Sequence, residues 1–163
     1  MNNRSPSYKI QSYQQVDVIG WRILGELQKD ARLSMAELGR RVGLSAPAVT
    51  ERVRRLEDAG IITGYSAQID LKILGRNILA YIRISAAGQV KDRVYKVVSA
   101  MPEVLECHRA TGGACFIIKV AVEDITHLER VSDAFADFGQ LTTTIVLSTL
   151  IEKKSIEPLS SSD

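Results

Sequence analysis

The chain has 163 residues, of which 45% are hydrophobic and 25% charged, with a formal net charge of +2 at pH 7; this length suffices for one ordinary domain or two small ones. Its longest apolar windows are far too short to cross a bilayer, and its polar first 15 residues lack the apolar core of a signal peptide. With only two cysteines, which argues against a disulfide scaffold, we expect a cytoplasmic protein with no membrane partner.

The front of the chain predicts a polar tail followed by helices. Residues 1–15 are polar and aperiodic, which is typical of a tail. A first amphipathic helix, capped by Asp17 and running to about residue 30, is predicted by apolar residues three and four apart: Val16, Ile19, Ile23 and Leu27. Ser34 and Glu37 form an S-x-x-E capping box, in which each side chain accepts a hydrogen bond from a backbone N–H that the helix start leaves unpaired. Gly43 ends this second helix.

A third helix begins at Ser45, with Pro47 in its first turn, and ends at Gly60. The stretch that follows alternates between apolar and polar residues and contains Gly64. We therefore expect a wing or linker strand within residues 64–76.

The back half predicts the order β-α-β-β-α-β. Alternating or β-branched stretches predict strands, and spacings of three and four predict helices; in chain order the segments are 77–85, 90–101, 103–110, 115–122, 124–139 and 141–151. The second and third strands are joined through Thr111-Gly112-Gly113. This order implies a four-stranded antiparallel sheet with two helices on one face, and residues 152–163 form a second polar tail.

The third helix has a narrow apolar stripe and a wide polar surface. Val49, Val53 and Leu56 share one sector. Opposite or flanking them are small residues near the start and charged residues further along: Pro47, Ala48, Thr50, Glu51, Arg54, Arg55 and Asp58. Small side chains permit close approach to base edges, and arginines bind phosphates or guanine. Arg52 lies nearer the apolar edge, so it either anchors the fold or reaches a backbone.

The spacing around this helix is that of a helix-turn-helix. In the window 35–54, Gly43 is the ninth residue, with apolar residues around it. Residues 1–76 hold 12 Lys/Arg against 8 Asp/Glu, a balance of +4, while residues 77–163 hold 9 against 11, a balance of −2. The alternative is a solvated charged face, but helix order and charge together favour double-stranded DNA as the partner.

Residues 23–65 resemble, almost word for word, the DNA-binding domain of the leucine-responsive and asparagine-activator (feast/famine) transcription regulators. The resemblance implies an α+β two-domain fold: a three-helix winged helix-turn-helix over 16–63 and a ferredoxin-like βαββαβ domain over 77–151. It further implies a homo-oligomer, a dimer through the back-half sheets that assembles into tetramers or octamers. Two helix-turn-helix units would face successive major grooves of a promoter or operator.

The resemblance also assigns roles to residues. It places Ser34, Met35 and Ser45 at the starts of the two motif helices, and Arg40 and Arg41 near a phosphate strand. Groove-facing positions match Pro47, Ala48, Thr50, Glu51, Arg54 and Arg55, and we add Arg52 to the expected DNA-binding set.

The expected effector loop departs from the family pattern. In family members that bind amino acids, the sequence of this loop resembles T/S-G-D-x-D. In this chain the loop consists of Thr111, Gly112, Gly113, Ala114 and Cys115. Both carboxylates that could pair with an α-ammonium group are missing. Either the effector is not a simple amino acid, or it binds through backbone and hydroxyl groups, or there is none; we favour a changed or absent response.

Other functions fit the sequence less well. Cys107, His108, Cys115 and His127 lack the spacing of a metal site, so no metal or cofactor is expected. Proteins that resemble this fold also include sirohaem decarboxylases, for which His108, His127, Arg83 and Arg109 are available. That enzyme would leave the basic helix unexplained, so we expect no enzyme. A nucleoid-compacting protein, with little preference between DNA sequences, remains an alternative.

Overall fold

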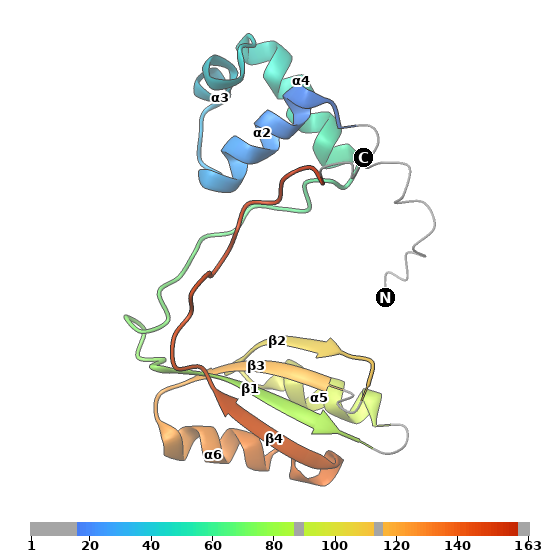
Figure 1. Cartoon of the computed structure of the whole chain (residues 1–163), viewed down its shortest axis with the longest axis vertical. Helices are drawn as coiled ribbons and strands as arrows, with labels where there is room; N and C mark the ends of the chain where they lie inside the picture. Colours follow the sequence, from blue (N-terminus) through green and yellow to red (C-terminus); the bar gives the residue numbers. More distant parts are fainter. Residues whose placement is uncertain (1–15, 87–89, 113–115, 160–163) are drawn as a thin grey trace. The chain divides into compact units, whose positions relative to one another are not determined.

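The computed structural model describes residues 16–86, 90–112 and 116–159, which belong to two compact units. The first unit comprises residues up to 67 together with the segment from 151, and the second comprises residues 68–150. Figure 1 shows helices in the first unit, and a sheet with helices in the second. No helix of the described part is long and apolar enough to cross a membrane.

The first unit contains α2 (Val18–Lys29), α3 (Met35–Val42) and α4 (Ala46–Asp58). The side chains of the three predicted caps each accept a hydrogen bond from a backbone N–H of the first turn: Asp17 from Gly20, Ser34 from Glu37 and Ser45 from Ala48. Only half of the predicted capping box forms as expected, because the Glu37 carboxylate accepts hydrogen bonds from Arg40 and Arg41 instead.

One apolar stripe from each helix builds the core of this unit. The buried side chains are those of Ile23, Leu27, Leu38, Val42, Val49, Val53 and Leu56. The helical spacing predicts these positions, while Val16 and Ile19, predicted on the same stripe, are only partly buried against this core. Burying apolar side chains of this size stabilises the fold by about 1.5–3 kcal/mol each. The core therefore fixes which face of α4 points outward.

The turn between α3 and α4 brings two backbone segments very close. Gly43 ends α3 in the left-handed region with φ of +77°, as predicted from the sequence. The Leu44 N–H then donates to the Gly39 carbonyl over 2.8 Å. A Cβ atom on Gly39 would lie only 2.6 Å from the Leu44 carbonyl oxygen, so this helix position requires glycine.

The segment after α4 differs from the expected wing strand. Gly60 has φ of +68°, and the Ile61 N–H donates to the Leu56 carbonyl, which ends the helix as predicted. Residues 64–76 contain no strand, only a turn at 71–75. Within the described residues no strand pairs with this segment, so its alternating pattern has no neighbour to supply sheet hydrogen bonds.

The second unit has the predicted βαββαβ order. Its strands are β1 (Ile78–Ser85), β2 (Val104–Arg109), β3 (Phe116–Val122) and β4 (Gln140–Ile145), and its helices are α5 (Lys91–Ala100) and α6 (Ile125–Asp133). The sheet is antiparallel with the order β2-β3-β1-β4.

Helices α5 and α6 pack on one face of this sheet. Alternate residues of β1, namely Ala80, Ile82 and Ile84, are fully buried beneath them. The intervening residues of β1 lie on the opposite, open face, and include the half-buried Tyr81 and the exposed Arg83. Among the described residues, the helices of this unit pack only against the face that carries Ala80, Ile82 and Ile84.

Two predicted elements of this unit are longer than the observed ones. The helix expected over 124–139 ends at Asp133, and a 3-10 turn (Ala136–Phe138) follows. The strand expected over 141–151 ends at Ile145, because its sheet neighbour β1 begins at Ile78. The last hydrogen bond between the two strands runs from the Val146 N–H to the Leu79 carbonyl.

Part of the expected C-terminal tail is held by α2. The Gln28 side-chain amide donates to the Ile156 carbonyl over 3.1 Å and accepts from its N–H over 2.8 Å. The segment around Ile156 is therefore bound to the first unit through its backbone.

Candidate nucleic-acid interface

The outward face of α4 carries a network of four charged side chains. Arg54 donates to both Glu51 carboxylate oxygens over 3.1 Å and to Asp58 over 3.0 Å. Arg55 donates to Glu51 over 3.0 Å. The side chains of Arg54 and Arg55 are 61% and 74% exposed. Such exposed pairs are weak, and a guanidinium carries five N–H donors, so both groups have donors available for a phosphate or a base while they still bind Glu51.

These ion pairs keep Glu51 charged. Hydrogen bonds from Arg54 and then Arg55 lower the pKa of the Glu51 carboxyl to about 2. At neutral pH the side chain is therefore an ionised group that only accepts hydrogen bonds.

The first turns of α4 present little bulk. Pro47 and Ala48 are small and exposed, and the Thr50 hydroxyl donates to the Ala46 carbonyl over 2.7 Å. Ser45 caps the helix. A surface of this kind can approach base edges closely.

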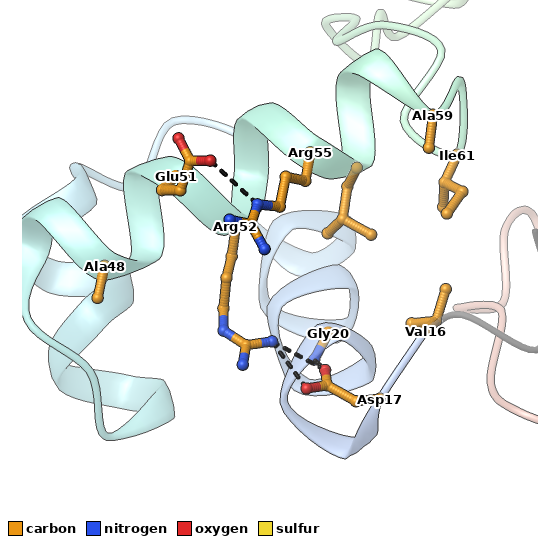
Figure 2. A pocket seen from close by; sticks show the side chains of 10 residues that line it. Val16, Asp17, Gly20, Ala48, Glu51, Arg52, Arg55, Ala59 and Ile61 are labelled. Carbon is orange, nitrogen blue, oxygen red and sulfur yellow. Dashed lines mark hydrogen bonds and ion pairs between the residues drawn. The ribbon is translucent and has the colours of Figure 1, made fainter.

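Arg52 binds another part of the protein. Its Nη1 lies 3.0 Å and 2.8 Å from the two carboxylate oxygens of Asp17 at the start of α2. Figure 2 shows this pair beside a cavity between α2 and α4. The volume of this cavity is about 540 Å³. Arg52 was expected either to anchor the fold or to reach a DNA backbone, and in this structure it anchors the fold by binding Asp17.

The arginines of α3 are also paired. Arg40 binds Glu37, while Arg41 binds both Glu37 and Glu26, each within 3.0 Å. The Arg40 side chain is 77% exposed and that of Arg41 is 40% exposed, so Arg40 is the freer of the two to bind a phosphate.

The remaining predicted residues of this site have structural roles. Ser34 and Ser45 cap their helices through their hydroxyl oxygens, and Met35 packs against the core of the first unit. Gly39, which allows α3 and α4 to approach, was missed; the available signal was a glycine inside a predicted helix, four residues before Gly43.

The expected effector loop is described only in part. Thr111 and Gly112 follow β2 and are exposed, and Gly112 has φ of +95°. Gly113, Ala114 and Cys115 lie outside the described residues.

The histidines considered for metal or enzyme chemistry both contact carboxylates. His108 contacts Glu106 over 3.2 Å, and His127 contacts Glu103 over 3.0 Å. Among the described residues, no group of three or more His, Cys, Asp and Glu side chains could hold a metal ion.

The helix triad and the exposed basic face of α4 define a helix-turn-helix DNA-binding protein. Residues 16–63 match the model of a winged helix-turn-helix DNA-binding domain, and residues 79–156 match that of the Lrp/AsnC ligand-binding domain. The chain therefore belongs to the Lrp/AsnC family of DNA-binding transcription regulators.

Named relatives support this assignment. The regulator LrpC of Bacillus subtilis is 35% identical over 138 residues, which cover 85% of this chain and 96% of LrpC. The solved structure of LrpC matches with a TM-score of 0.80 over 84% of this chain and 98% of that one. The Neisseria meningitidis regulator NMB0573, solved as a complex with L-Met, is 29% identical and matches with a TM-score of 0.81 over 88% of this chain and 97% of that one.

Proposed function

We propose that this regulator binds promoter DNA by placing α4 in the major groove. The observation that carries this proposal is the outward face of α4, where small residues at the start precede the exposed Arg54 and Arg55. Arg55 and Arg40 contact phosphates, and Arg54 sets the register and contacts a base.

The test compares Arg54→Ala and Arg55→Ala with Arg22→Ala, an equal loss of charge on an exposed position of α2. Affinity for the DNA upstream of the protein's own gene is measured by fluorescence anisotropy. Arg54→Ala is expected to cost roughly 1–3 kcal/mol if it contacts a base, and Arg55→Ala is expected to weaken binding to all sequences alike. Losses no larger than that of Arg22→Ala would contradict the assignment of α4.

We further propose that the protein is a homo-oligomer whose dimer forms through the open face of the sheet and which assembles into a tetramer or octamer. Support comes from the half-buried Tyr81 on a face that the helices of the second unit leave uncovered. The protein would act in the cytoplasm, where bacterial DNA lies, and we propose no enzymatic role.

For the effector, we propose a changed or absent response to amino acids. NMB0573 has been solved with L-Met, which makes an amino acid the class to test. Residues 111–115 of this chain contain no carboxylate for an α-ammonium group. A thermal shift assay with each of the common amino acids is expected to show no stabilisation at millimolar concentration. A stabilising amino acid would contradict an absent response and would show that the effector binds without a loop carboxylate.

A further inference from the structure

We propose that Glu51 determines sequence specificity by accepting a hydrogen bond from the N4 amino group of a cytosine in the major groove. This inference rests on the proposed insertion of α4. It assigns to one carboxylate the selection of a base, a task usually given to the neighbouring arginines.

The first argument is the composition of the helix start. Recognition helices contact base edges mainly with their N-terminal residues. In the first six residues of α4, two alanines and a proline have no polar side-chain atoms, Val49 is buried, and the Thr50 hydroxyl donates to Ala46. Glu51 is the sixth residue and the first with a long polar side chain, which leaves it to make the direct base contact.

The second argument is the direction of Glu51. It lies on the side of α4 opposite Val49 and Val53, and its side chain is 43% exposed. Arg54 and Arg55 hold the carboxylate by three hydrogen bonds, two to Oε1 and one to Oε2. A carboxylate offers about four acceptor sites, so Oε2 retains one for a further donor while its orientation is fixed.

The third argument is which donor fits. A carboxylate near phosphates is tolerated when arginines offset its charge and a base supplies a proton. In the major groove only cytosine N4 and adenine N6 donate, and adenine places the acceptor N7 beside its amino group. An ionised carboxylate is repelled by that N7, so cytosine is the better partner. Arg54, bound to the same carboxylate, is suited to the guanine of that pair.

The experiment measures the binding of three full-length proteins to duplexes in which each base pair of the upstream site is replaced in turn. Wild type is expected to prefer cytosine on the order of tenfold at one position of each half-site. Glu51→Gln is expected to move that preference to adenine, because an amide pairs with adenine N6 and N7.

Glu57→Gln is the matched control. Glu57 is an exposed residue near the end of α4, and its carboxylate accepts a hydrogen bond from the Tyr65 hydroxyl. This change therefore makes the same substitution and removes one negative charge without touching the helix start or the partners of Arg54. It is expected to tighten binding to all duplexes and to leave base preferences unchanged. A base preference is the ratio of one variant's affinities for two duplexes, so it does not depend on the fraction of that variant that is folded. Circular dichroism checks that each variant folds.

If Glu51→Gln keeps the wild-type preferences and merely tightens binding as Glu57→Gln does, Glu51 acts only through its charge and the inference is overturned while DNA binding stands. If wild type binds none of the duplexes at low salt, the proposed function itself fails. Glu51→Ala provides a second reading of the position: the cytosine preference should disappear with no new preference in its place.

Discussion

Asp17 contacts both its own helix and α4. Its carboxylate accepts a hydrogen bond of 2.7 Å from the Gly20 N–H and two of 2.8 and 3.0 Å from the Arg52 guanidinium. The Gly20 N–H and then Arg52 lower the pKa of Asp17 below its ordinary value of 3.8. This residue therefore caps α2 and also links the start of α2 to the middle of α4.

We predict that Asp17→Ala destabilises the protein by about 1 kcal/mol, because it removes a helix cap, and that Asp17→Asn costs less, because asparagine still caps. Because the folded pKa is depressed, the contribution of Asp17 is present above pH 3.8 and is lost as pH falls through the folded pKa. Urea denaturation at several pH values should show the difference between wild type and Asp17→Ala shrinking in acid. A difference that is constant down to about pH 2 would contradict the role of the charge.

The sequence predicted the direction of Arg54 and Arg55 but not their partners. Direction follows from the 3.6-residue period and the buried stripe of α4. The link between Arg52 and Asp17 joins residues 35 positions apart, and it depends on the angle at which α2 and α4 pack, which no local pattern encodes.

Helices α3 and α4 depend on a close backbone approach at Gly39. Its missing Cβ leaves space for the Leu44 carbonyl, and the Leu44 N–H binds the Gly39 carbonyl in the same turn. The angle at which α4 leaves the turn is therefore tied to one glycine.

We predict that Gly39→Ala lowers the free energy of unfolding by about 1–3 kcal/mol, because the new methyl group has backbone rather than a flexible side chain against it. Gly25→Ala is the control: a Cβ at Gly25 meets nothing within 4 Å, so the higher helix propensity of alanine should stabilise α2 by up to about 1 kcal/mol. Chemical denaturation measures both. Equal effects of the two substitutions would refute the close approach.

Where local signals and tertiary contacts agree, the elements were predictable. Caps and stripes predicted the three helices of the first unit, and alternating or β-branched stretches predicted the four strands of the second. The wing strand over 64–76 and the far end of β4 were not predictable, because a strand needs a neighbour and alternation does not reveal whether one is present.

Within the described residues, the second unit carries one sheet face that its own helices, α5 and α6, do not cover. Side chains alternate across each strand, so residues beside the buried Ala80 and Ile82 of β1 point to the open face. Tyr81 lies between these two residues. A face of this kind suits a second copy of the chain.

We predict that Tyr81→Glu shifts the protein toward monomer, because it places a charge in the proposed interface. Tyr95→Glu, on the 68% exposed Tyr95 of α5, makes the same chemical change away from the open face and should leave the mass unchanged. Light scattering coupled to size exclusion measures both. An unchanged mass for Tyr81→Glu, with folding verified, would place the interface elsewhere.

The most direct test of DNA recognition is the affinity of the intact protein for the DNA upstream of its own gene and for a scrambled duplex, titrated by fluorescence anisotropy at several salt concentrations. We expect tighter binding to the native sequence and a linear fall of log K with log salt, since arginines displace counterions from phosphates. Equal affinity for both duplexes would indicate a nucleoid-compacting protein. No binding to either duplex at low salt would contradict DNA recognition by α4.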